Sequence, residues 1–214
     1  MVKKKATDNL SDGICADCSI RTVAIRRYAD ANVPVEYWDL SMDNFHGPGK
    51  LKSKYEEIVG NLPEVYKKGY TICLAGQHGV GKTMSLCNII KVASLKGYTG
   101  LYTSLSDIAN VSTSPDMDDR FSAQRELKSV DFLTIDEVDD RFLSQSNHSN
   151  EFFSRLFELT LRTRIQNSLP TFIATNSPNL REVFGGAFKA SLGSLLHKFV
   201  TITVVGEDVR RKVK

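Results

Sequence analysis

The sequence lacks the features that mark secreted, membrane-spanning and disulfide-bonded proteins. No apolar stretch approaches the roughly 20 residues needed to cross a bilayer. The first residues, Met-Val-Lys-Lys-Lys and then polar residues, do not form the apolar segment of a signal peptide. The four cysteines, at positions 15, 18, 73 and 87, do not form a disulfide framework. Internal repeats and low-complexity tracts are also absent. We therefore expect a cytoplasmic protein without a membrane partner.

Charge and composition give only a general frame. The chain has 214 residues, of which 41% are hydrophobic and 25% charged, and this suits one α/β domain with a short extra segment. A net charge of +3 favours polyanionic partners only weakly and does not establish nucleic-acid binding. The composition changes near residue 50. We expect residues 1–50 to form an amino-terminal arm that binds a partner, partly because they hold the only tryptophan, Trp38. Residues 51–214 are expected to form the core.

Residues 76–83 read Gly-Gln-His-Gly-Val-Gly-Lys-Thr, a complete G-x-x-x-x-G-K-S/T phosphate-binding loop between an apolar and an amphipathic run. A polyphosphate needs several converging backbone N–H donors, which a glycine-rich turn at a helix amino terminus supplies. Lys82 is expected to reach the β- and γ-phosphates, and the Thr83 hydroxyl to complete a Mg²⁺ shell. The predicted nucleotide-contacting residues are Gly76, Gln77, His78, Gly79, Val80, Gly81, Lys82, Thr83 and Met84.

Two carboxylates follow the apolar run at residues 131–135. In an open parallel α/β fold, the carboxyl ends of the strands hold the ligand. Asp136 is expected to hold Mg²⁺ through water, and Glu137 to orient or deprotonate the water that attacks the γ-phosphate. The next acidic residues, Asp139 and Asp140, are interpreted as caps of the following helix.

Asn176 follows another apolar run, residues 171–175. An amide at the tip of a strand beside the phosphate loop can hydrogen-bond both the γ-phosphate and the attacking water. The alternative is a turn residue before Ser177-Pro178. Its position after the other two motifs favours the first interpretation.

Helical and strand periods alternate from residue 51 onward, which predicts a parallel sheet flanked by helices. Five strands are expected, at residues 70–75, 99–103, 131–135, 171–175 and 200–205. Helices are expected at residues 51–66, 82–95 and 150–165, with a short helix after residue 107 and the end of another at residues 192–199.

Residues 76–83, 135–137, 170–176 and 206–210 together resemble the AAA+ ATPases of the DnaC/DnaI helicase-loader group, to which the IstB transposition ATPases are related. The resemblance extends from about residue 31 to the carboxyl terminus. It implies an AAA+ P-loop fold without a carboxyl-terminal helical lid, ATP and Mg²⁺ as cofactors, and ATP hydrolysis. It also implies a replicative helicase and single-stranded DNA as partners, and a homo-oligomer that forms on ATP binding.

The resemblance also assigns roles to individual residues. Asp136 and Glu137 become the metal-binding and water-activating pair, and Asn176 becomes the sensor after the fourth strand. Arg210 becomes an arginine similar to a second sensor, and Arg164 falls in the helix before the fourth strand, where this group commonly carries an arginine. A solvent-exposed arginine on a helix face is the alternative for Arg164.

The sequence departs from the group where an arginine finger is expected. Residues 188–198, before the last strand, contain no arginine. Lys189 and Lys198 lack the planar fork with which arginine grips phosphate. Hydrolysis is therefore expected to be slow, unless Arg164, Arg181 or another protein supplies the finger.

The sequence is also compatible with other functions. An IstB-like transposition ATPase shares the core, and a nucleotide-gated adaptor with vestigial hydrolysis fits the missing finger. A small-molecule P-loop kinase needs an arginine-rich lid, and residues 104–129 hold only two arginines. The Cys15-Ala-Asp-Cys18 pair is either part of a degenerate zinc module or two ordinary thiols, because a closed zinc site needs four ligands. Cys73 and Cys87 are expected to be core thiols.

Overall fold

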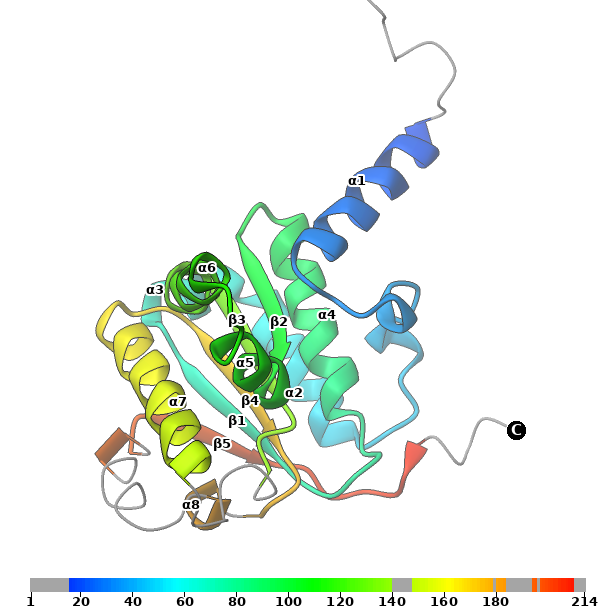
Figure 1. The fold of residues 1–214 in the computed structure, drawn as a ribbon. Helices are drawn as coiled ribbons and strands as arrows, with labels where there is room; N and C mark the ends of the chain where they lie inside the picture. Colours follow the sequence, from blue (N-terminus) through cyan, green and yellow to red (C-terminus); the bar gives the residue numbers. More distant parts are fainter. Residues whose placement is uncertain (1–15, 140–147, 179, 184–193, 196, 210–214) are drawn as a thin grey trace, which may run out of the picture.

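Five parallel strands form one sheet at the centre of the molecule, with helices on both faces (Figure 1). The computed structural model describes residues 16–139, 148–178, 180–183, 194–195 and 197–209. The sheet has the order β2-β3-β4-β1-β5, and every pairing is parallel. This confirms the predicted fold class. The strands are β1 (Thr71–Ala75), β2 (Gly100–Ser104), β3 (Phe132–Asp136), β4 (Thr171–Thr175) and β5 (Phe199–Thr203).

Side chains alternate along the strands between two apolar clusters, as the period of a strand requires. On β1, Ile72 and Leu74 enter one cluster, and Cys73 enters the other. Phe172 and Ile173 on β4 divide in the same way. Four of the five strands are buried along almost their whole length, which is typical of a parallel sheet covered on both faces.

The helices that cover the first face are α2 (Gly49–Gly60), α3 (Leu62–Lys68) and α4 (Lys82–Leu95), and those over the second are α5 (Leu105–Ser112), α6 (Met117–Ser129), α7 (His148–Gln166) and the short α8 (Leu180–Val183). The single helix predicted at residues 51–66 is two helices. The break lies at Asn61, because Pro63 in the first turn of α3 cannot donate an N–H to a preceding turn. The polar stretch at residues 104–129 forms two helices rather than one short helix. Ser104 and Asp107 build a capping box on the first, and Asp116 caps the second.

The segment before α2 has two parts: a projecting helix, and an irregular stretch that packs against the body. Helix α1 (Ala16–Asp30) extends away from the body (Figure 1). Beyond it, η1 (Val35–Tyr37) and η2 (Met42–Asn44) lie against α4. The buried residues of this stretch belong to the first apolar cluster: Ala31, Val33, Met42 and Phe45. The boundary at residue 50 stays a prediction, but residues 31–45 share the apolar core of the sheet.

Cys73 and Cys87 are buried free thiols, which confirms their prediction as core residues. Burial raises the pKa of the Cys73 thiol to about 12, so this group stays protonated. The hypothesis that Cys15 and Cys18 belong to a zinc module stays untested. Cys15 and the side chain of Cys18 both lie outside the described residues. Within the described ranges, no helix is long and apolar enough to span a membrane.

Candidate functional site: a phosphate loop at the carboxyl edge of the sheet

The predicted phosphate loop joins the end of β1 to the start of α4. Gly79 and Gly81 have φ of 76° and 93°, in the left-handed region that disfavours other residues. A side chain would also have no room, because a Cβ would meet the Asp208 carboxyl at Gly79 and the Phe45 ring at Gly81. The carboxyl-terminal segment lies along the loop, since the N–H of Val209 donates to the carbonyl of Gly79 at 2.9 Å. These glycines allow two distant segments to close around the loop.

Lys82 is buried beneath the loop in the first turn of α4. Its Nζ donates to the carbonyl oxygens of Gly76 at 2.6 Å and Gln77 at 2.9 Å. It also donates to Oδ1 of Asn176 at 2.9 Å. The ammonium therefore connects the loop to the end of β4. This is the position from which a cation can serve both a bound phosphate and a neighbouring amide.

Asp139 fixes the orientation of Asn176, a role that the sequence analysis missed. Its buried carboxylate accepts from the backbone N of Asn176 at 3.1 Å and from the side-chain Nδ2 at 2.9 Å. The Oδ1 atom of that amide is thereby left to face Lys82. The expectation that Asp139 and Asp140 cap the next helix stays a prediction, because residues 140–147 lie outside the described residues. In the sequence, Asp139 lies three residues after Asp136, and this short spacing is the feature that could have indicated its role beside β4.

Asp136 ends β3 and is only 4% exposed. Its Oδ2 accepts from the Tyr102 hydroxyl on β2 at 3.0 Å, and its Oδ1 accepts from the N–H of Glu137 at 2.8 Å. Burial and the charge of Asp136 raise the pKa of Tyr102 far above its ordinary value, so the phenol stays a donor. Glu137 is exposed and has φ of 53°, an uncommon backbone conformation that recurs at functional sites. Tyr102 is a second residue that the sequence analysis missed.

A cavity of about 440 Å³ joins these groups. Among the predicted residues, the cavity wall includes His78, Gly79, Gly81, Lys82, Thr83, Met84, Asp136, Glu137 and Asn176. Gly76, Gln77 and Val80 are not on the wall. Val80 is fully buried, and the Gln77 amide donates to the carbonyl of Gly206. The remaining wall comes from six residues. Tyr37, Leu40, Phe45 and Val209 form its apolar part, and Asn44 and His46 are polar. Polar and charged groups thus gather beside the loop, next to an apolar wall.

A comparison with protein-family models shows to which family of proteins the chain belongs. The model described as "ATPase family associated with various cellular activities (AAA)" matches residues 72–184, more than half of the chain. The chain belongs to the AAA family. As a member of this family it is a nucleotide-binding protein of the ATPase class. The matched range includes the phosphate loop, Asp136, Glu137 and Asn176, but not the residues of the apolar wall.

Solved AAA+ structures share the fold. A DnaI structure superposes with a TM-score of 0.65 at 20% identity, covering 86% of this chain and 98% of that one. A DnaC helicase loader superposes with 0.62 at 16% identity, covering 80% and 100%. The replication initiator DnaA, bound to AMPPCP and single-stranded DNA, gives 0.63 at 19% identity, but this chain spans only 50% of its length. No curated protein matches in sequence. The resemblance to the DnaC/DnaI group is confirmed at the level of the fold.

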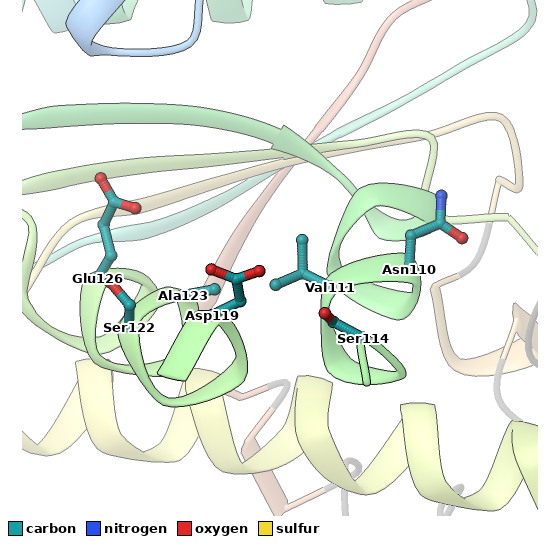
Figure 2. A pocket seen from close by; sticks show the side chains of 7 residues that line it. All are labelled: Asn110, Val111, Ser114, Asp119, Ser122, Ala123 and Glu126. Atoms are coloured by element: carbon teal, nitrogen blue, oxygen red, sulfur yellow. The ribbon is translucent and has the colours of Figure 1, made fainter. Parts of the chain in front are cut away.

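A second hollow of the AAA chain lies between α5 and α6 and measures about 460 Å³ (Figure 2). Asn110, Val111 and Ser114 face it from the α5 side, and α6 supplies Asp119 and Glu126. Its lining among the described residues has two carboxylates and no cation, so a triphosphate is repelled there. The phosphate-loop cavity therefore suits a triphosphate better than this hollow does.

The structure does not bring Arg164 to the AAA site. Its guanidinium is fully buried and donates to Oγ1 of Thr171 and to four backbone carbonyls, those of Leu127, Val130, Asp131 and Pro170. These acceptors lie where β3 and β4 begin, roughly 15 Å of strand away from the residues that end them. Because the guanidinium is fully buried and bonded within its own chain, it is not exposed to a neighbouring subunit, and we infer a structural role for Arg164 rather than that of a finger. Arg210 lies outside the described residues, as does most of the stretch at residues 188–198.

Arg164→Met should destabilise the fold and leave nucleotide binding intact in the folded fraction. The variant leaves several buried carbonyls without donors, so we expect the free energy of unfolding to fall by about 3 kcal/mol or more. Urea denaturation measures it. Arg162→Met on the same helix is the matched control, because its pairing with Glu158 is partly exposed and should contribute under about 1 kcal/mol. Unchanged stability together with lost ATP turnover in Arg164→Met would restore the finger role.

Proposed function

We propose that this AAA+ protein binds and hydrolyses ATP and acts in DNA replication as the loader of a replicative helicase. The observation that carries the ATPase part is the convergence of Lys82, Asp136, Glu137 and Asn176 on one cavity. The loader part is supported by coverage, because the chain matches nearly the whole length of the DnaI and DnaC loader structures but half of DnaA. In this role the protein assembles on the helicase, on single-stranded DNA or on both.

The proposed chemistry follows from what each side chain now binds. Lys82 donates to neutral carbonyls, and the phosphate oxygens of ATP are stronger acceptors that would draw its ammonium away from them. Asn176 is held by Asp139, which accepts from its Nδ2, so its Oδ1 is presented in a fixed orientation as an acceptor for Lys82 and for the attacking water. Glu137 orients or deprotonates the attacking water. With these roles, Asn176 is the residue that senses a bound triphosphate.

Magnesium fits the oxygen ligands at the site. The Thr83 hydroxyl and the buried Asp136 carboxylate line the same cavity, and Mg²⁺ commonly takes one or two protein oxygens and retains several waters. Bound there, the ion would neutralise charge on the β- and γ-oxygens. Tyr102 would hold the Asp136 carboxylate in place for that ligand role.

The apolar wall supplies the second half of the nucleotide site. Ligand pockets are lined mainly by aromatic and aliphatic side chains with a few placed polar groups. Tyr37, Leu40 and Phe45, with Val209, would face the base and ribose, while the loop faces the phosphates. Residues before α2 therefore take part in nucleotide binding under this proposal.

Helix α1 is the proposed contact with the helicase. Ile20 is 67% exposed, Val23 51% and Ile25 37%, on a helix that projects from the body (Figure 1). Ile20 and Val23, three residues apart, share one face of this helix, and neighbouring exposed aliphatic side chains can mark an interaction surface. Two alternatives remain. In an IstB-like transposition ATPase the same helix would contact a transposase, and in a nucleotide-gated adaptor ATP binding alone would drive assembly into a homo-oligomer.

The Glu137→Gln variant, held in its ATP-bound form, should capture the replicative helicase from an extract of the source cell. Mass spectrometry of the captured proteins identifies the partner. Lys82→Ala should capture none, because it cannot bind ATP. Adding Ile20→Ser and Val23→Ser to the Glu137→Gln protein should reduce capture about tenfold or more while ATP binding is retained, since both side chains are exposed and outside the site.

Each other outcome selects an alternative. Capture of a transposase instead of a helicase supports the transposition ATPase. ATP-dependent self-association without either partner supports the adaptor. Full capture by the Ile20→Ser, Val23→Ser protein would move the contact from α1 to the ATPase core.

A further inference from the structure

Lys91 makes a set of contacts that the catalytic residues do not explain. It lies on α4, the helix that begins at Lys82, and is only 6% exposed. Its Nζ donates to the carbonyl oxygens of Tyr37 at 2.8 Å, Trp38 at 2.8 Å and Leu40 at 2.7 Å. An ammonium has three N–H donors, so these bonds satisfy it completely.

The ammonium holds a segment that has no strand partner of its own. The carbonyls of residues 37, 38 and 40 converge on one point because η1 turns the chain back beside α4. Burial lowers the pKa of Lys91 from its ordinary value, which shows the cost of placing the charge there. The ring of Tyr28, 5.2 Å from Nζ, offers a further favourable contact. Removal of this charge would leave three partly buried carbonyls without their donor.

The same segment forms the apolar wall of the nucleotide cavity. Tyr37 and Leu40 line that cavity, and their carbonyls bind Lys91. Lys82, at the phosphate end, and Lys91 lie on one rigid helix. Helix α4 thus fixes the distance between the phosphate loop and the wall at residues 37–40.

We propose that Lys91 is a positioning residue that sets the nucleobase side of the site. The inference rests on the proposed nucleotide-binding function. Its consequence is selective: without Lys91 the protein loses affinity for the base and ribose of ATP and keeps its affinity for the phosphates.

The test compares ATP with inorganic tripolyphosphate, which has the phosphates but no base or ribose. Isothermal titration calorimetry measures both affinities for the parent and for Lys91→Met. We expect the variant to bind ATP about tenfold or more weakly, a difference of about 1.4 kcal/mol. Its affinity for tripolyphosphate should stay within about twofold, since Lys82 and the loop are unchanged. An equal loss for both ligands, or none for ATP, would overturn the proposal.

Lys96→Met is the matched control, because Lys96 also donates to a backbone carbonyl, that of Val59, but on an exposed surface away from the cavity. Lys96→Met should change neither affinity.

Trp38, the only tryptophan, reports on the anchored segment directly. Its emission should shift to longer wavelength in Lys91→Met and remain unchanged in Lys96→Met. A parent that binds neither ligand would refute the proposed nucleotide site itself, and this result differs from a variant-specific failure.

A second variant covers the case in which Lys91→Met does not fold. Lys91→Gln keeps an amide donor for part of the carbonyl set, so it should fold and show a smaller ATP-specific loss. If neither variant folds, Lys91 is required for the fold as a whole, and the specific positioning role is refuted.

Discussion

Lys82→Ala should abolish measurable ATP binding. The ammonium is buried beneath the loop, and no other lysine or arginine lines the described cavity, so the variant leaves the triphosphate without its compensating charge. Hydrogen bonds to charged groups contribute about 1.5–3 kcal/mol each. Loss of two of them predicts a decrease in affinity of at least about 100-fold. Isothermal titration calorimetry with ATP and Mg²⁺ measures the effect.

Lys96→Ala serves as the control for this variant, since Lys96 is a lysine near the other end of α4 that contacts only an exposed carbonyl. A thermal unfolding curve should show that Lys82→Ala remains folded, because its alanine is compatible with the first turn of a helix. Unchanged ATP affinity in the folded Lys82→Ala protein would remove the phosphate loop from the mechanism.

The parts of the site that the sequence predicts are local or follow from strand direction. The loop, β1 and α4 are contiguous, so one stretch of chain contains the glycine turns and Lys82 together. Asp136 and Asn176 come from distant segments, but both follow apolar runs. Their meeting at one edge then follows from the parallel direction of β3 and β4. The hydrogen bond between Lys82 and Asn176 is the direct result of that geometry.

The parts that the sequence does not predict depend on side-chain directions between remote segments. Tyr102 faces Asp136 because β2 pairs with β3 in one register, and a neighbouring register would turn it away. Arg164 has the sequence context of an exposed helical arginine, but α7 packs it against the carbonyls that precede β3 and β4. The wall at residues 37–40 depends on Lys91, whose buried position within α4 no local pattern reveals.

Glu137→Gln should retain ATP and lose turnover. The amide has nearly the size of the carboxylate but is not a base, and general-base catalysis typically contributes 10²–10⁴ in rate. Exposure of Glu137 and its position in a turn after β3 mean that the substitution removes no buried contact, so affinity should change by less than about threefold.

The parent's own rate sets the scale of this experiment. A P-loop site without a trans arginine loses roughly 10³–10⁵ in rate, so basal hydrolysis is expected to be slow, and the loss in Glu137→Gln is best measured in the presence of the captured partner. Phosphate release in single-turnover conditions gives the chemical step directly, and calorimetry gives the affinity. Glu64→Gln, an exposed glutamate on α3 paired with Lys68, should leave both unchanged. Equal hydrolysis by the parent and Glu137→Gln would show that another group activates the water, and Asp136 would then have to be tested for both roles.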